Sequence, residues 1–235
     1  KVAFIRYLEK PKGMAPDGLK SNSWGAEARL VFRETGPSVT LNIASKLADQ
    51  AEWLVRRDPE YLVTYPSNLM ALLDHFERNN LTLPALRQVV AVSEVVSDRH
   101  REACRRIWGV QINDLYTCEE TGYLALQCPD FDHYHVQSEN VYLEVVDDNG
   151  DPCKAGERGR VLITSLHNFA TPLIRYEIGD YAEVGEVCSC GRGLPVLNRI
   201  AGRVRNMLTL PSGDKFWPSF PEGEMMPIAP IAPMP

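Results

Sequence analysis

The stretch that decides the fold runs from residue 61 to residue 115 and reads YLVTYPSNLMALLDHFERNNLTLPALRQVVAVSEVVSDRHREACRRIWGVQINDL. Short apolar runs between turn residues predict three strands, which are Tyr61–Tyr65, Leu86–Val92 and Val110–Leu115. The two segments between them repeat apolar side chains about every 3.6 residues, which predicts two helices. One opens at Pro66, and the other is capped by Ser97 or Asp98. This alternation with short connections indicates an α/β fold with a doubly wound parallel sheet.

The flanking segments extend this prediction. Upstream, the apolar pattern predicts a helix over Ile43–Arg57 that ends at Pro59. Downstream of Gly122, short alternating runs separated by turns predict a smaller antiparallel β subdomain. These runs are Val141–Val146, Gly159–Ser165, Leu173–Tyr176 and Tyr181–Val184. We therefore divide the chain into three parts, which are residues 1–122, 123–206 and 207–235.

Composition and charge limit the classes of protein that need to be considered. The 44% hydrophobic and 24% charged residues are ordinary for a globular domain, and no apolar run approaches the roughly 20 residues that span a bilayer. A net charge of −6 gives no reason to expect binding to nucleic acid. Six cysteines scattered through 235 residues do not form a small disulfide scaffold, so we expect a reducing, cytoplasmic compartment.

Three polar stretches carry residue types that suit a nucleotide. Tyr116 and the carboxylates after it follow a predicted parallel strand, where a ring can stack on a purine and a carboxylate can hold magnesium. Asp180 follows a glycine turn, and in other nucleotide sites a carboxylate placed in this way holds the two hydroxyls of the ribose. Arg203 can reach a ribose or phosphate oxygen. Taken singly, these stretches are better explained as a polar loop, a β-turn aspartate and a solvated basic turn.

Taken together, the three stretches resemble the core motifs of the adenylate-forming superfamily. The resemblance is strongest to the phenylacetate–coenzyme A ligase branch and to related synthetases that adenylylate a deazaflavin coenzyme. The family motif Tyr-Gly-x-Ser/Thr-Glu corresponds to Tyr116–Glu120, and Tyr-x-x-Gly-Asp corresponds to Tyr176–Asp180. The motif Gly-Arg-x-Asp is matched by Gly202 and Arg203, and the segment Cys188–Pro195 is typical of the phenylacetate branch.

The resemblance implies a role for each matched residue. Glu120 would be the catalytic residue that helps to bind magnesium, Asp180 would hold the ribose hydroxyls and Arg203 would support the ribose or a phosphate. Tyr116 would flank the adenine of ATP or AMP. The residues implied in binding the nucleotide are Ser93, Glu94, Tyr116, Thr117, Asp180 and Arg203.

The implied reaction has two steps. A small carboxylic acid attacks the α-phosphate of ATP and gives an acyl-AMP with release of pyrophosphate, and a thiol such as coenzyme A then displaces AMP. On this basis residues 1–122 would be a partial nucleotide-binding subdomain, and residues 123–206 would complete the adenylate site. The implied partners are the acid and coenzyme A, and a homodimer is left open.

Several positions depart from the family pattern. Glu119 stands where a Ser or Thr contacts phosphate, Thr117 replaces the motif glycine and Arg205 replaces a hinge aspartate. The glycine-rich loop that cradles pyrophosphate has only a poor counterpart at Ser21–Gly25. We expect the C-terminal lid domain to be absent and the tail from Pro227 to be unstructured. The chain is therefore expected to be a core fragment that is inactive alone, and the alternative is a non-catalytic nucleotide- or partner-binding module with a structural zinc.

Cysteine and histidine side chains supply the zinc prediction. Cys188 and Cys190 form a Cys-x-Cys pair that is followed by glycine. The two cysteines are too close in sequence to favour a disulfide with each other, so binding of a shared metal is the more natural use of the pair. Cys128 and His135 lie in the loop after the Tyr116–Glu120 motif, and His133 in the same loop is a second imidazole that could bind the metal. Because three thiolates and one imidazole make a common closed zinc site, we predict Cys128, His135, Cys188 and Cys190 as ligands. Ordinary thiols with no metal are the alternative.

Overall fold

The structure, a computed structural model, describes residues 1–25, 35–203, 208–211 and 215–216. The predictions for Arg205 and for the tail from Pro227 therefore lie outside the described residues. The described helices are α2 (Leu47–Arg57), α3 (Pro66–Arg78) and α4 (Asp98–Trp108). None of these three has both the length and the apolar character that a membrane crossing requires.

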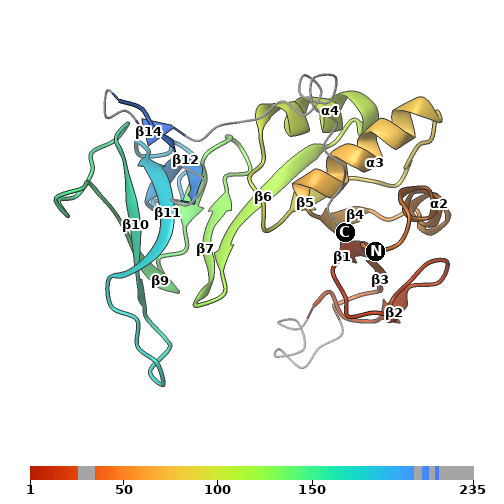
Figure 1. The fold of residues 1–235 in the computed structure, drawn as a ribbon, viewed down its shortest axis with the longest axis horizontal. Helices are drawn as coiled ribbons and strands as arrows, with labels where there is room; N and C mark the ends of the chain where they lie inside the picture. Colours follow the sequence, from red (N-terminus) through yellow and green to blue (C-terminus); the bar gives the residue numbers. More distant parts are fainter. Residues whose placement is uncertain (26–34, 204–207, 212–214, 217–235) are drawn as a thin grey trace.

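Twelve strands within the described ranges form one mixed sheet (Figure 1). Their order across the sheet is β2-β3-β1-β4-β5-β6-β7-β8-β12-β11-β10-β9. Their bounds are β1 (Val2–Arg6), β2 (Leu19–Ser21), β3 (Ser38–Asn42), β4 (Tyr61–Thr64), β5 (Gln88–Ala91), β6 (Gln111–Cys118), β7 (Gly122–Gln127), β8 (Tyr134–Val136), β9 (Val141–Val146), β10 (Arg158–Ser165), β11 (Tyr176–Val184) and β12 (Val196–Arg203). A separate pair is made by β13 (Leu208–Thr209) and β14 (Lys215–Phe216).

One half of the sheet confirms the predicted α/β class. Strands β3, β1, β4, β5 and β6 are parallel neighbours, and β2 adds a short antiparallel edge. Helix α2 packs on α3 and α3 packs on α4, so these helices form one layer beside the parallel strands (Figure 1). The two layers share one apolar core, in which Trp53, Leu69, Leu72 and Phe76 are fully buried.

Helices α3 and α4 begin and end where the sequence signals predict. Pro66 lies in the first turn of α3. Backbone N–H groups in that turn make no hydrogen bond within the helix, so the lack of an N–H on proline costs none. At the start of α4, the ring of His100 accepts a hydrogen bond from the backbone N–H of Ser97, which completes a capping box. Gly109 ends α4 with a φ of 70°, which glycine adopts without a steric penalty.

Helix α2 begins at Leu47, later than the predicted start at Ile43. The cause is the buried side chain of Asn42, whose amide donates to two backbone carbonyls, those of Leu8 and Lys12. Its Oδ1 accepts the backbone N–H of Ala44, so the chain turns locally before the helix can start. This side-chain competition is invisible to an apolar pattern, which is why the prediction began too early.

Strand β6 joins the parallel half to the antiparallel half (Figure 1). It pairs in parallel with β5 as far as Asp114 and in antiparallel with β7 from Leu115 onward. It also continues to Cys118, beyond the predicted end at Leu115. On its buried face, Ile112 belongs to the core of the parallel half and Tyr116 to the core of the antiparallel half. The strand that carries Tyr116 therefore connects both cores.

The other half of the sheet is the predicted antiparallel segment. Strands β9 and β10 agree with the predicted runs. Strand β11 contains the run predicted over Tyr181–Val184, but it includes only the last residue of the run predicted over Leu173–Tyr176. Neighbours from β6 to β9 in the sheet order all pair in antiparallel. The domain boundary proposed at residue 122 coincides with the first residue of β7 and stays a prediction.

Ser93 carries local backbone strain at the carboxyl end of β5. Its φ is 68°, in the left-handed region that costs a residue with a Cβ about 1 kcal/mol or more. We expect Ser93→Gly to raise the free energy of unfolding by about 0.5–1 kcal/mol, measured by urea denaturation. Ser138→Gly is the matched control, because that exposed turn serine does not have a positive φ. Equal effects of the two substitutions would show that the conformation of Ser93 is unstrained.

Candidate functional site

The three predicted nucleotide motifs meet in the antiparallel half. The hydroxyl of Tyr116 on β6 donates a hydrogen bond to Oδ2 of Asp180 on β11, at 2.9 Å. Nε of Arg203 on β12 lies 3.6 Å from Oδ1 of the same carboxylate. Asp180 and Arg203 are also direct partners in the pairing of β11 with β12. The fold thus gathers three side chains that lie far apart in the sequence, and we call them the Asp180 group.

The electrostatics of this group suit a hydrogen-bond acceptor for hydroxyls. Burial raises the pKa of Asp180 above its ordinary value, while the hydrogen bond from Tyr116 and the charge of Arg203 act to lower it. Burial and the neighbouring carboxylate hold the pKa of Tyr116 well above its ordinary value, so this phenol stays a neutral donor. A carboxylate held by one hydroxyl and one cation keeps lone pairs for the two hydroxyls of a sugar.

Glu120, the predicted magnesium ligand, lies in the turn that links β6 to β7. It is exposed, as is Glu119 beside it, and its negative charge acts to raise the pKa of Asp180. Thr117 lies on β6 opposite Tyr123 and is exposed as well. An exposed carboxylate beside the Asp180 group fits magnesium, which keeps several waters and takes only one or two protein carboxylates.

Glu94 makes a contact that the sequence analysis did not foresee. Its carboxylate accepts the backbone N–H of Ser67 at 2.8 Å and the hydroxyl of Ser67 at 2.9 Å. A carboxylate at this place satisfies donors in the first turn of α3 and interacts favourably with the helix dipole. Ser93 and Glu94 are both exposed at the end of β5, and their role beside the adenine stays a prediction.

The predicted zinc ligands are also neighbours. Cys128, His133, His135 and Cys188 each offer one donor atom, and these atoms all lie within 4.8 Å of one another. Cys190 adjoins them, with its Sγ 3.3 Å from Nε2 of His135. The structure therefore brings together the four residues predicted from the sequence and adds His133 as a fifth donor. We call these five residues the Cys/His cluster.

Two properties of the Cys/His cluster fit a bound metal. Nε2 of His133 and Nδ1 of His135 are buried, and neither has a hydrogen-bond partner among the described residues. The backbone N–H of Arg192 is the main cause that lowers the pKa of Cys190 to about 6, which favours the thiolate that metals bind, whereas burial raises the pKa of Cys188. Thiols beside unpartnered imidazole nitrogens match the donor set of a closed zinc site.

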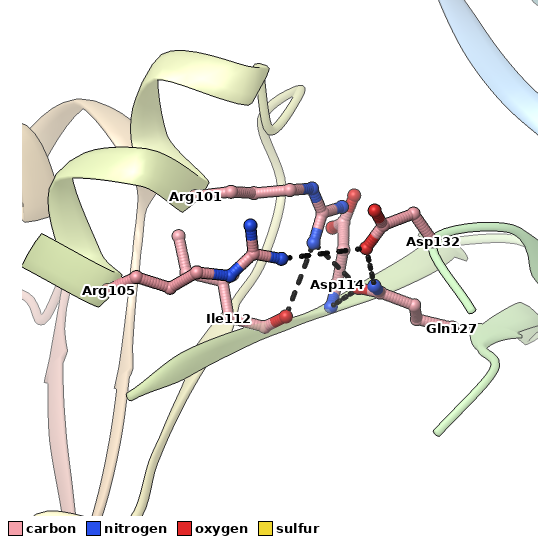
Figure 2. Close-up of polar contacts among 6 residues, drawn as sticks. All are labelled: Arg101, Arg105, Ile112, Asp114, Gln127 and Asp132. Atoms are coloured by element: carbon pink, nitrogen blue, oxygen red, sulfur yellow. Dashed lines mark hydrogen bonds and ion pairs between the residues drawn. The ribbon is translucent and has the colours of Figure 1, made fainter. Parts of the chain in front are cut away.

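The sequence analysis missed a buried polar network next to the Cys/His cluster. Arg101, Asp114 and Tyr134 are each less than a tenth exposed. Figure 2 shows how Arg101 and Asp114 converge on the side chain of Gln127. One signal was present in the sequence, because the alternation of a strand places Asp114 on the same face as Tyr116.

Comparison with known sequences gives the relatives of this chain. Phenylacetate–coenzyme A ligase of Escherichia coli is 26% identical over 228 residues, which cover 94% of this chain and 50% of that protein. The same enzyme of Thermus thermophilus is 28% identical over 182 residues, which cover 74% of this chain and 41% of that protein. The chain is similar to phenylacetate–coenzyme A ligases. It spans about half the length of these relatives, and no family model matches it.

Solved structures place the chain in the fold of acyl- and aryl-coenzyme A ligases. A 2-hydroxyisobutyryl-CoA ligase in complex with 2-HIB-AMP superposes with a TM-score of 0.72 and 20% identity, over 92% of this chain and 46% of that chain. An anthranilate CoA ligase in complex with anthranoyl-AMP gives a TM-score of 0.59 and 24% identity, over 77% of this chain and 37% of that chain. The resemblance to adenylate-forming ligases inferred from the motifs is therefore confirmed at the level of sequence similarity and fold.

Proposed function

We propose that the chain is the nucleotide-binding core of an adenylate-forming ligase that joins a carboxylic acid to a thiol such as coenzyme A. The observation that carries this proposal is the Asp180 group, in which a buried carboxylate is held by Tyr116 and Arg203. The similarity to phenylacetate–coenzyme A ligases supports it, as does the likeness to folds that were solved with acyl adenylates.

The proposal assigns a role to each residue of the site. Asp180 accepts hydrogen bonds from the two ribose hydroxyls, Tyr116 fixes that carboxylate and borders the adenine, and Arg203 supports a ribose or phosphate oxygen. Glu120 would hold magnesium, which would neutralise charge on the phosphates. Held in this way, the nucleotide presents its α-phosphate to the acid, and most of the rate acceleration comes from positioning.

The bond changes follow from this arrangement. A carboxylate oxygen of the acid forms a bond to the α-phosphorus of ATP, and the bond to the bridging oxygen breaks with release of pyrophosphate. The sulfur of the thiol then attacks the acyl carbon, the thiol loses its proton, and AMP leaves with the electron pair of the broken bond. The exposed carboxylates of Glu119 and Glu120 would place negative charge near the phosphates, and magnesium held by Glu120 would offset that charge.

Isothermal titration tests the proposal. We expect the chain to bind AMP and ATP, with the affinity for ATP dependent on magnesium and the affinity for AMP less so. The matched ligand is 2′-deoxy-AMP, which lacks one hydroxyl that Asp180 would accept and should bind about 5-fold to 10-fold more weakly, as expected for one hydrogen bond. Absence of binding to both AMP and ATP would refute a nucleotide site.

We propose, as a second function, that the Cys/His cluster binds a structural zinc ion. Cys128 follows β7, and Cys188 and Cys190 lie in the connection from β11 to β12. A metal held by these thiols and by an imidazole of β8 would fasten the two connections to each other. The cluster has buried imidazole nitrogens with no hydrogen-bond partner among the described residues, which supports the proposal, since a metal bound at one of them would satisfy it. The zinc would contribute stability and would not touch the reacting atoms.

A further inference from the structure

A buried polar network lies where the two cores of the molecule meet. Nη1 of Arg101, from α4, donates to the backbone carbonyl of Ile112 at 3.3 Å and to Oε1 of Gln127 at 3.0 Å (Figure 2). The same Oε1 accepts the backbone N–H of Asp114 at 3.0 Å. The hydroxyl of Tyr134 donates to Oδ2 of Asp114. We call Arg101, Asp114, Gln127 and Tyr134 the Asp114 network.

This network lies across three adjacent strands. Gln127 on β7 and Tyr134 on β8 are direct partners in the sheet, and Asp114 lies on β6, on the other side of β7. Tyr134 is also the partner of Leu197 on β12, the strand that ends at Arg203. One set of hydrogen bonds therefore joins the strand of Tyr116 to a strand that pairs directly with the strand of Arg203.

The position of Asp114 on β6 explains why the network can control geometry. Ile112 belongs to the core of the parallel half and Tyr116 to the core of the antiparallel half, with Asp114 between them on the same face. A slip of β6 against β7 or β8 would leave a buried donor or acceptor unpaired, which is unfavourable. The directional hydrogen bonds of the network therefore add to the backbone pairing in favouring the observed register of β6.

Two outer contacts meet at Asp132 in the β7–β8 connection, one from Arg105 on α4 and one from Gln127 on β7. Nη2 of Arg105 lies 4.0 Å from Oδ1 of Asp132, and Nε2 of Gln127 donates to that oxygen at 3.4 Å (Figure 2). These side chains are more exposed than Arg101 and Asp114, so salt and water screen them. The buried hydrogen bonds of the Asp114 network are therefore the stronger constraint on the position of β6.

We propose that Tyr134 and Asp114 are positioning residues for the adenosine site. They hold β6 so that the hydroxyl of Tyr116 meets Asp180, although neither of them would touch the nucleotide. This inference rests on the proposed function, because it concerns the residues assigned there to adenosine. It adds a specific consequence, namely that the hydroxyl of Tyr134 contributes to nucleotide affinity from outside the site.

The substitution Tyr134→Phe removes this hydroxyl and keeps the ring that packs in the core. We expect the Kd for AMP to rise about 3-fold to 30-fold, the range found for residues that modulate a site without contacting its ligand. Tyr142→Phe is the matched control, because it removes the hydroxyl of a largely exposed tyrosine on β9. The far-ultraviolet circular dichroism spectrum and the zinc content of both variants should equal those of the wild type.

A double-mutant cycle shows whether the effect passes through Tyr116. Titrations of AMP are made with the wild type, Tyr134→Phe, Tyr116→Phe and the double variant. If the network positions the Tyr116 hydroxyl, Tyr134→Phe will raise the Kd much less when that hydroxyl is already absent. Equal fold-changes in both backgrounds, or an unchanged Kd in Tyr134→Phe, would overturn the inference while leaving the proposed function standing. A wild type that does not bind AMP would overturn both.

Discussion

Removing zinc from the loaded protein is expected to lower its free energy of unfolding by about 4 kcal/mol, for a free zinc concentration about a thousandfold above Kd. The proposed ligands come from β8 and from two connections that only folding brings together, so the free energy of binding a metal there would become folding free energy. Elemental analysis of protein purified without added metal gives the zinc content. Urea unfolding with and without a chelator then gives the difference in stability.

Cysteine variants separate this effect from a general action of the chelator. Cys188→Ser should lose the zinc, and its unfolding should no longer respond to the chelator. Cys153→Ser is the matched control, since Cys153 is equally a partly buried free cysteine but lies outside the Cys/His cluster. Wild-type protein with a zinc content near zero, and with unfolding that the chelator does not change, would refute the structural zinc.

The same measurements decide which donors bind. The sequence analysis assigned His135 and Cys190, whereas the four donors that lie mutually within 4.8 Å include His133 in place of Cys190. We expect His135→Ala to lose zinc and His133→Ala to retain it. Retention of zinc by Cys190→Ser together with loss by His133→Ala would instead establish two thiolates and two imidazoles as the ligands.

Local patterns were sufficient to predict the helices and several of the strands. The apolar faces of α3 and α4 repeat with the helical period, and Pro66 and Gly109 mark their limits through backbone geometry. Strands β1, β2, β3 and β8 were not predicted, because three to five residues carry too little periodicity. Strands β7 and β12 are longer but were also not predicted, because their sequences, GYLALQ and VLNRIAGR, do not alternate between apolar and polar residues. The start of α2 was wrong because a buried asparagine side chain, Asn42, competes for local backbone groups.

The sequence also predicted one part of the candidate sites and missed another. The motif residues of the Asp180 group could be found from the sequence because their types and order are specific to one family. Their geometry could not be found, since Tyr116 was predicted to follow a strand and instead lies within β6 with its side chain buried. The Asp114 network was missed because it depends on contacts between Asp114, Gln127 and Tyr134 that only the pairing of three strands creates.

Replacing Asp180 with alanine is expected to weaken AMP binding by about 1–3 kcal/mol, the loss that accompanies removal of hydrogen bonds to a charged group. The substitution removes the proposed acceptor of the ribose hydroxyls and also leaves the hydroxyl of Tyr116 and the guanidinium of Arg203 without their shared partner. Isothermal titration measures the affinity, and thermal unfolding shows whether the variant is folded. Asp151→Ala is the control, because that aspartate is exposed and outside the Asp180 group.

A second variant separates charge from shape at the same position. Asp180→Asn keeps the size of the side chain and an oxygen that can accept from Tyr116, but it loses the negative charge that strengthens hydrogen bonds to hydroxyls. Its AMP affinity should therefore lie between those of the wild type and Asp180→Ala. If a folded Asp180→Ala protein binds AMP as tightly as the wild type, the ribose is held elsewhere. The pairing of Tyr116 with Asp180 would then be a structural contact between β6 and β11 alone.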